Sequence, residues 1–230
     1  MKTIGLIGGI TWHSTLDYYR LINEGVNNKL GGAHSAKLII NSVDFADIKI
    51  LTQTEKWDEI AAVMIDAAKA LERAGVACVM LGANTMHNIA EKVQSAINIP
   101  LIHIAEATAL AIENKKLKTV ALLGTKYTMQ LDFYKRILAQ HGISTIIPGD
   151  DDIEYINYTI YEEFSKGIFL PETKEKYLAI IDKLVKNGAE GIILGCTEIP
   201  ILLKQDDCDV PLFDTAFIHS MAAMDFAMKA

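Results

Sequence analysis

A cysteine followed by two polar side chains is the part of this sequence best suited to chemistry. Cys196, Thr197 and Glu198 come directly after Gly195, and an apolar run over residues 191–194 precedes them. Such a run is typical of a buried parallel strand, and open α/β sheets bind ligands where their strands end. A thiol beside a helix start has a lowered pKa as a rule, so we expect Cys196 to be reactive. Most lone cysteines are only small buried hydrophobes, so the interpretation needs a second observation.

An internal repeat supplies that observation. Residues 79–85 also consist of an apolar strand, Leu-Gly, a small residue and polar residues, and Ala83 falls opposite Cys196 when the stretches are aligned. More widely, residues 74–104 match residues 187–213 in order and spacing. The repeat predicts two similar halves that face each other, with Ala83 and Cys196 on opposite walls of one cleft. Only one of these half-sites contains a thiol.

Strands and helices alternate along the chain. The apolar runs predict strands over residues 2–8, 36–43, 77–81, 99–104, 118–123, 144–148, 191–194 and 209–213. Helical spacing predicts helices over about residues 16–27, 55–74, 85–97, 128–140, 153–166, 172–187 and 214–228. Alternation of this kind is typical of right-handed βαβ units and parallel sheets. We therefore expect an α/β fold of two pseudo-symmetric domains, each a short parallel sheet flanked by helices, with the active site in the cleft between them.

Composition excludes several classes of function. The chain has 230 residues and a formal net charge of −7, without a Lys/Arg cluster, which argues against nucleic-acid binding. No apolar stretch approaches the length of a membrane span, and the N-terminus lacks a secretory cleavage pattern. The three cysteines form no metal-ligand spacing and cannot all pair with one another. These features favour a cytoplasmic protein that binds a small molecule and needs no metal.

A glycine turn follows the first predicted strand. Gly8 and Gly9 separate that strand from the first helix, and the free N–H groups of such a turn can hold an anion. The turn has neither the three spaced glycines of a dinucleotide site nor the Gly-Lys-Ser/Thr of a P-loop. A small carboxylate therefore fits it better than a nucleotide does.

Five motifs, taken in order, resemble the aspartate/glutamate racemase family. They are GGITWHST at residues 8–15, LGGAHSA at 30–36, SVDF at 42–45, NTMH at 84–87 and GCTEI at 195–199, and the resemblance covers essentially the whole chain. It implies two pseudo-symmetric α/β domains, no cofactor, a homodimer, and proton transfer at the substrate α-carbon by two cysteines. It also implies a C-terminal helix that returns to the first domain. The first domain would then comprise residues 1–105 and 210–230, and the second residues 106–209.

The resemblance assigns roles to individual residues. Cys196 corresponds to the second catalytic cysteine. The residues that correspond to contacts with the substrate's α-carboxylate and amino group are Asn84, Thr85 and Thr197, with Thr125 and Thr128 in the matching loop of the second half. Lys166 corresponds to a lysine that meets the side-chain carboxylate, and Gln53 lies in a segment that supplies another contact to it.

Each of these residues also has an ordinary structural interpretation. Taken alone, Lys166 would be a solvated surface lysine, and Gln53 would be a loop residue. Asn84 and Thr85 are also suitable residues for capping a helix.

The chain departs from the family at one decisive position. The first catalytic cysteine should be residue 83, which is alanine in this chain, and a methyl group cannot carry a proton. Cys78 lies inside the preceding predicted strand, Cys208 lies in a polar loop, and His87 is more often a packing histidine. We therefore expect no replacement for the missing thiol.

The sequence favours a racemase-family protein for aspartate or glutamate, with activity that is impaired or limited to one face of the substrate. Two alternatives remain open. One is a single-cysteine malonate-type decarboxylase of the same superfamily, whose thiol protonates the carbanion left by decarboxylation. The other is a protein that binds an acidic amino acid without turnover. Lys166 and the Asn84-Thr85 pair favour a dicarboxylic amino acid over an arylmalonate.

Overall fold

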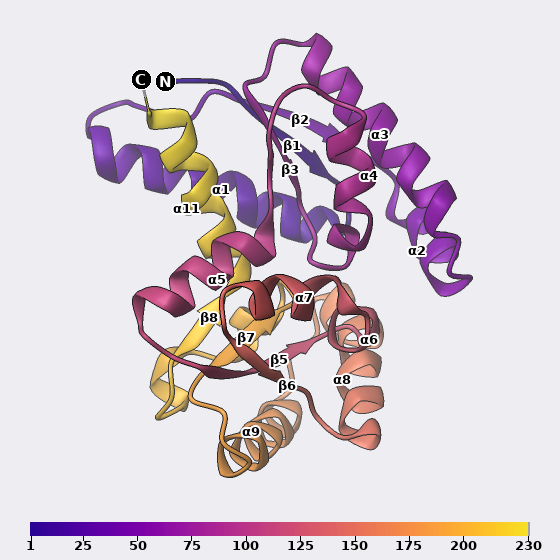
Figure 1. Ribbon diagram of the computed structural model, residues 1–230, viewed down its shortest axis with the longest axis vertical. Helices are drawn as coiled ribbons and strands as arrows, with labels where there is room; N and C mark the ends of the chain where they lie inside the picture. The colour runs from indigo at the N-terminus through magenta and orange to yellow at the C-terminus, as the bar shows by residue number, and fades with distance from the viewer. Residues whose placement is uncertain (230) are drawn as a thin grey trace. The chain divides into compact units, whose positions relative to one another are not determined.

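The computed structural model describes residues 1–229 and divides the chain into two compact units. The first contains residues 1–103 and the C-terminal residues from His219 onward, and the second contains Ile104–Ile218. Each unit has its own sheet of four parallel strands with helices packed on it (Figure 1). The expected α/β fold class is confirmed.

The sheet of the first unit has the strand order β2-β1-β3-β4. These strands are β1 (Ile4–Gly8), β2 (Leu38–Ser42), β3 (Cys78–Leu81) and β4 (Leu101–Ile102). Because neighbouring strands are parallel, their carboxyl ends lie at one end of the sheet. Gly8 pairs with Ser42 there, and the Gly82 N–H donates to the Ile7 carbonyl at 2.8 Å. The glycine turn and the stretch around Ala83 therefore start from adjacent strands.

Helices cover the first sheet. They are α1 (Trp12–Leu30), α2 (Phe45–Gln53), α3 (Trp57–Arg73), the 3-10 turn η1 (Thr85–Ile89), α4 (Ala90–Ser95) and the C-terminal part of α11 (Thr215–Met228). Val79 and Leu81 of β3 share a buried cluster with Ile60 and Met64 of α3. On α1, the fully buried residues are Tyr18, Ile22 and Val26, which lie one helical turn apart. Alternation along the strands and helical spacing on the helices thus build this core.

In the second unit the strand order is β6-β5-β7-β8. The strands are β5 (Thr119–Gly124), β6 (Ser144–Ile146), β7 (Ile192–Gly195) and β8 (Leu212–Asp214). Successive β5 residues enter different cores: Ala121 and Leu123 pack with α8 (Asp150–Glu162) and α9 (Pro171–Lys186). Val120 and Leu122 pack with α5 (Ile104–Asn114) and α7 (Asp132–Gln140). The short elements of this unit are α6 (Lys126–Gln130), η2 (Phe164–Lys166), α10 (Ile199–Leu202) and η3 (Gln205–Asp207). A strand that is apolar on both faces therefore becomes the centre of a covered sheet.

The internal repeat extends to side-chain hydrogen bonds. Gln94 Oε1 accepts from the Leu101 N–H at 2.7 Å, and Gln205 Oε1 accepts from the Leu212 N–H at 2.9 Å. In both cases the glutamine precedes its partner by seven residues. Each side-chain nitrogen also donates to a carbonyl two residues before that partner. The two halves therefore share a local structure as well as a pattern of strands.

Two helices and one boundary differ from the sequence prediction. We did not predict α2 or α5, which fill the intervals before residues 55 and 118. We expected residues 210–230 to join the first domain, but β8 pairs in parallel with β7, and the second unit extends to Ile218. Backbone pairing with β7 thus keeps residues 210–218 in the second unit, and only the later part of α11 returns to the first.

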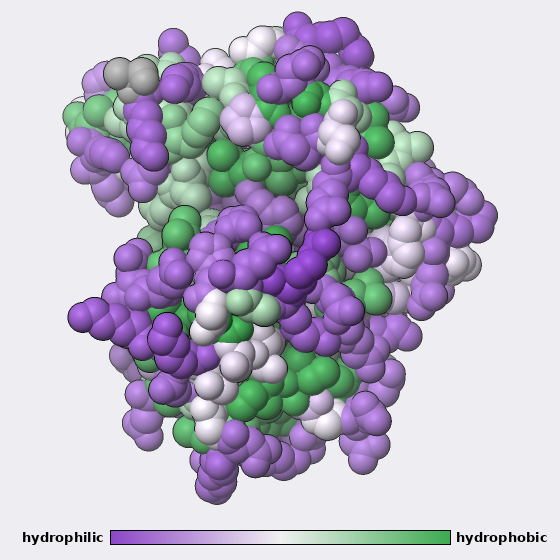
Figure 2. All heavy atoms as spheres, viewed as in Figure 1, coloured by the Kyte–Doolittle hydropathy of each residue, from purple (hydrophilic) through white to green (hydrophobic). Residues whose placement is uncertain are grey.

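One face of the molecule is mainly polar in character (Figure 2). Figure 2 shows a face on which hydrophilic residues predominate and hydrophobic residues occur in smaller groups. Within residues 1–229, none of the helices combines the length and the apolar composition needed to cross a bilayer.

Candidate active site

Cys196 directly follows the last residue of β7, and its sulfur is hydrogen-bonded to a carboxylate. The Sγ atom lies 3.0 Å from Glu198 Oε2, and Thr197 Oγ1 donates to the same oxygen at 2.7 Å. Cys196 and Glu198 are both buried, with 8% and 6% of their surface exposed. One carboxylate oxygen therefore receives a thiol proton and a hydroxyl proton in a site with little water.

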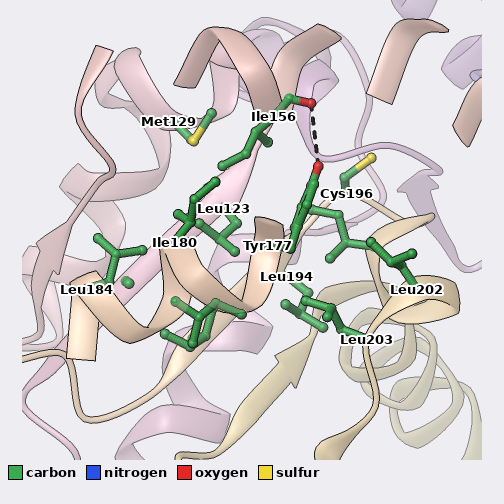
Figure 3. Close-up of a cluster of buried hydrophobic side chains, with 14 of the residues drawn as sticks. Leu123, Met129, Ile156, Tyr177, Ile180, Leu184, Leu194, Cys196, Leu202 and Leu203 are labelled. Carbon is green, nitrogen blue, oxygen red and sulfur yellow. Dashed lines mark hydrogen bonds between the residues drawn. The ribbon is translucent and has the colours of Figure 1, made fainter. Parts of the chain in front are cut away.

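Burial raises the pKa of the Cys196 thiol well above its ordinary value, and the charge of Glu198 and the hydrogen bond to it act in the same direction. The N–H groups of Glu198 and Ile199 lower this pKa, but their effect is smaller. Our expectation of a lowered pKa was therefore wrong. The helix that follows, α10, has only four residues, and the thiol lies at the margin of an apolar cluster (Figure 3). The resting group is a protonated thiol directed at a base.

Glu198 is a candidate functional residue that we did not single out from the sequence. The signal was present, since a carboxylate two residues after the cysteine interrupts a segment that continues as Ile199-Pro200-Ile201. A buried carboxylate needs hydrogen-bond donors, and Cys196 and Thr197 provide them. The sequence did not reveal that the side chain turns back toward the thiol.

Close backbone packing brings Thr125 to the same end of the sheet as Cys196. Gly124 and Gly195 are register partners, and a Cβ on Gly195 would lie 2.6 Å from the Leu123 carbonyl. Only glycine permits this approach. Thr125 caps α6 by accepting from the Thr128 N–H at 3.3 Å, and the two hydroxyl oxygens lie 3.2 Å apart. The loop with Thr125 and Thr128 thus follows β5, and Cys196 follows the neighbouring strand β7.

A tyrosine on α8 is a second residue that the sequence interpretation missed. The pKa of Tyr161 is raised by burial first, and then by its proximity to Tyr127 and Cys196. Tyr161 lies in the helix that leads toward Lys166.

Lys166 lies at the surface in η2. Its Nζ is 2.7 Å from Glu162 Oε2, and 56% of the side chain is exposed. The Glu162 carboxylate raises the pKa of this lysine. In this structure the lysine is thus paired with a residue one turn earlier in the chain.

In the first unit, the counterpart of the thiol site is the turn after β3. Ala83 is half-buried, whereas Asn84 and Thr85 are buried. Asn84 is the N-cap residue of η1, but its side chain makes no capping hydrogen bond there. His87 Nδ1 lies 2.9 Å from the Ala83 carbonyl oxygen. The alternative that Asn84 serves as a side-chain cap is therefore not supported.

The glycine turn joins this region through α1. Thr15 Oγ1 accepts from the Gly9 N–H at 2.7 Å, and Ser14 Oγ donates to the Gly82 carbonyl at 3.4 Å. Thr11 is the N-cap of α1 and accepts from the Ser14 N–H at 3.4 Å. The first turn of α1 is thus tied to the strands on which the two motifs begin.

The other two cysteines and His87 are at least partly buried, and their pKa values are shifted. Cys78 is fully buried in β3, and burial raises its pKa to about 11. Cys208 follows η3, where burial and two neighbouring aspartates raise its pKa. His87 is 2% exposed, and burial together with two other histidines holds its pKa well below the ordinary value. Gln53 is the exposed last residue of α2 rather than a loop residue.

The chain thus consists of two parallel α/β units, one with a thiol–carboxylate pair after its third strand and one with alanine at that place. Within residues 1–229, no group of three or more His, Cys, Asp or Glu side chains is arranged to hold a metal ion. The Asp/Glu/hydantoin racemase family matches residues 7–223. The chain belongs to this family, as its motifs indicated.

Several relatives show how far the similarity extends. The broad specificity amino-acid racemase RacX of Bacillus subtilis is 26% identical over 220 residues, which cover 93% of this chain and 92% of that protein. A candidate Asp/Glu racemase from Yersinia pestis is 45% identical, with a TM-score of 0.93 and full coverage of both chains. An aspartate racemase homologue from Pyrococcus horikoshii is 38% identical, with a TM-score of 0.87 and full coverage of both chains.

Proposed function

We propose that this chain is a cofactor-independent isomerase of the amino-acid racemase type that acts on aspartate or glutamate through Cys196. The observation that carries the proposal is the 3.0 Å contact between the Cys196 sulfur and Glu198 Oε2. A buried thiol with a high pKa keeps its proton and is a poor base by itself. An adjacent carboxylate can accept that proton and so generate the thiolate. The family membership of the chain supports the same reaction class.

The proton transfer balances with these two residues alone. Glu198 accepts the thiol proton, and the resulting Cys196 thiolate removes the α-hydrogen of the amino acid. The electron pair of the broken C–H bond is delocalised into the α-carboxylate. While the carbanion persists, the hydrogen now on the Cys196 sulfur exchanges with solvent. In the reverse step Cys196 gives the solvent-derived hydrogen to the carbon as a proton, and Glu198 gives its proton back to the sulfur.

Ala83 limits the reaction to one face of the substrate. A racemase needs a second group that protonates the opposite face of the carbanion, and a methyl group has no such proton. The reaction we expect is therefore exchange of the α-hydrogen with solvent, with the configuration retained. Inversion should be slow or absent.

The polar residues suggest how an acidic amino acid is held. The Thr197 hydroxyl donates to Glu198, so its oxygen retains the capacity to accept from a substrate ammonium group. Asn84 and Thr85 are suited to the α-carboxylate, and Thr125 to the polar end of the substrate beside Cys196. Lys166 would meet the distal carboxylate after leaving Glu162, and Gln53 would be a further contact to it. The breadth of specificity named for RacX makes neutral amino acids a necessary part of any test.

A single-thiol decarboxylase is the second candidate, and Ala83 is the observation that favours it. Decarboxylation of a malonate leaves a carbanion that needs one proton on one face, so a site with one thiol is complete for that reaction. It would use Cys196 as the acid, with its proton supplied again through Glu198.

Hydrogen exchange at the α-carbon in deuterated water tests the proposal. Mass spectrometry and chiral chromatography should show that one enantiomer of aspartate or glutamate gains deuterium and keeps its configuration. Racemisation would reveal a second base and contradict the role of Ala83. Release of carbon dioxide from a malonate, without exchange of any amino acid, would favour the decarboxylase. Tight binding of an acidic amino acid without exchange would favour a binding protein.

A further inference from the structure

A cluster of three histidines and one tyrosine lies in the first unit, next to the turn that contains Ala83. The His87 ring centroid is 4.6 Å from that of His103 and 5.4 Å from that of His219. Tyr18 packs edge-on against His219 at 5.6 Å, and its hydroxyl lies 2.9 Å from His219 Nδ1. His87, His219 and Tyr18 are almost fully buried. These side chains come from η1, α11, α1 and the segment before α5.

The carbonyl partners fix the tautomers of two of these histidines. His219 Nε2 lies 2.7 Å from the Ile102 carbonyl oxygen, which can only accept, so this nitrogen carries the hydrogen. The Nδ1 atom of neutral His219 then accepts from the Tyr18 hydroxyl. His87 Nδ1 lies 2.9 Å from the Ala83 carbonyl and must donate to it. His87 is therefore in the Nδ1–H tautomer and His219 in the Nε2–H tautomer.

The environment keeps His87 and His219 uncharged. Burial lowers the pKa of His219 to about 3, although its hydrogen bond to Ile102 acts in the opposite direction. Burial and the two neighbouring imidazoles hold the pKa of His87 well below the ordinary value. Three imidazoles at these distances would repel one another if they were protonated. His87 and His219 are thus neutral, and each has one defined tautomer.

We propose that His87 is a positioning residue for the substrate-binding turn that contains Ala83. Tyr18, His103 and His219 hold its ring in the orientation that donates a hydrogen bond to the Ala83 carbonyl. The hydrogen bond fixes the peptide group that joins Ala83 to Asn84. It therefore also fixes the point from which the Asn84 side chain extends. His87 is buried and its Nδ1 is committed to that carbonyl, so it acts through the turn and does not touch the reacting atoms.

The cluster also ties this turn to both ends of the first unit. His103 is the last residue before the chain passes into the second unit, and His219 is the first residue after it returns. Order in the Ala83 turn should therefore be coupled to order at both chain crossings. This assignment depends on the proposed function only in naming the turn as a substrate site.

Nitrogen-15 NMR of histidine-labelled protein tests the geometry without any turnover. His87 should give the signals of a neutral Nδ1–H tautomer at pH 6, and His219 those of a neutral Nε2–H tautomer. The exposed His34 serves as the internal reference. A His87 signal from the common Nε2–H tautomer, or from a cation at pH 6, would overturn the proposal.

Two substitutions then separate positioning from packing. His87→Asn keeps a nitrogen donor near the Nδ1 position, whereas His87→Phe keeps the ring volume and removes the donor. For His87→Phe we expect about a tenfold rise in KM for α-hydrogen exchange, because one hydrogen bond that orders the site is lost. We expect little change in kcat, and substantial recovery of KM in His87→Asn. His34→Asn is the matched control and should behave as the unsubstituted chain.

Hydrogen–deuterium exchange of the backbone keeps this test independent of catalysis. In His87→Phe, peptides that contain residues 83–87 should exchange faster, and so should those around residues 103 and 219. A fall in melting temperature with unchanged KM and unchanged local exchange would show that His87 only packs the core. If the unsubstituted chain neither binds nor exchanges any amino acid, the proposed function fails, and the tautomers and backbone exchange still decide the role of His87.

Discussion

Glu198 Oε2 lies 3.0 Å from the Cys196 sulfur and accepts the thiol hydrogen. The two residues are separated by Thr197 alone, so the acid and its base belong to one short turn after β7. Burial and the negative charge of Glu198 both raise the pKa of the thiol. The resting thiol therefore keeps its proton on sulfur, and in the mechanism we propose Glu198 removes it.

Cys196→Ser should abolish α-hydrogen exchange and leave the fold intact. A serine hydroxyl fits the space, but it is far less acidic than a thiol and is a poor proton carrier here. Exchange measured by mass spectrometry, with circular dichroism as the check on folding, gives the result. Cys208→Ser is the matched control and should keep full activity. Undiminished exchange in Cys196→Ser would remove this residue from the mechanism.

Glu198→Gln should produce two effects of opposite sign. The pKa of the Cys196 thiol should fall, since Glu198 raises it through both its charge and its hydrogen bond. Exchange should nevertheless slow by about 10²–10⁴-fold, the usual cost of losing a positioned base. Thiolate absorbance against pH reports the first effect, and deuterium incorporation reports the second. If exchange instead rises with the thiolate fraction, the carboxylate is not the acceptor of the proton.

Ala83→Cys should convert one-sided exchange into racemisation. The new thiol would supply the acid or base that is missing on the other face, with a gain of about 10²–10⁴-fold in the rate of inversion. Polarimetry or chiral chromatography of aspartate and glutamate measures it. Addition of Cys196→Ser should cancel the gain, because inversion needs both thiols. A folded Ala83→Cys variant that still binds aspartate but racemises no amino acid would show that the two half-sites are wrongly paired.

Lys166→Ala should weaken binding of aspartate more than binding of alanine. The reason is that a lysine facing the distal carboxylate contributes only when the ligand has one. Glu162→Gln should have the opposite effect, since it releases the lysine from its 2.7 Å ion pair. Lys186→Ala removes a lysine with the same i,i+4 pairing to an aspartate and should change neither affinity. Equal losses for both ligands in calorimetry would return Lys166 to the solvated surface.

Acid should destabilise the chain through His219. Its folded pKa is about 3, so the unfolded state binds more protons between about pH 6.5 and pH 3, and stability falls as pH falls through that window. The contribution of one such histidine is about 1.4 kcal/mol per pH unit. Urea unfolding of His219→Asn should show a slope smaller by about that amount.

His141 provides the control for this slope. Its hydrogen bond to Glu106 raises its pKa, and so does the one to Glu113, so its stabilisation is complete below the unfolded pKa and is lost as pH rises. His141→Asn should therefore shift the curve below pH 6.5 without changing its slope. If His219→Asn retains the original slope, the folded protein already carries a proton on His219.

The parallel sheets could be predicted from the sequence because apolar runs with punctuating glycines are strong local signals. The helix α1 begins at Trp12, earlier than helical spacing indicated, because Thr11 caps it. The helix α5 was missed because its residues follow directly on a short strand without a glycine or proline to separate them. Boundaries depend on hydrogen bonds that composition does not record.

The candidate site was predictable in position and less so in chemistry. The repeat that aligns Ala83 with Cys196 indicated both turns, and the structure places both after the third strand of their sheets. The raised pKa of Cys196 was not predictable, because it depends on which way the Glu198 side chain points. Tyr161 was also beyond the sequence, because it lies on a helix far from Cys196 along the chain.

The hydrogen bonds of Gln94 and Gln205 have a consequence for the tendency of the chain to aggregate. The outermost strands β4 and β8 are short, and an outer strand with free N–H groups invites aggregation by pairing with another chain. The Val79 N–H donates to the Pro100 carbonyl, so that carbonyl points toward the neighbouring strand. The N–H of the next residue, Leu101, points away from the sheet and donates to the Gln94 side chain. Gln205 does the same for Leu212. In each unit a glutamine side chain thus accepts a hydrogen bond from an outward-facing N–H group of an outer strand. That N–H group is then not available for pairing with another chain.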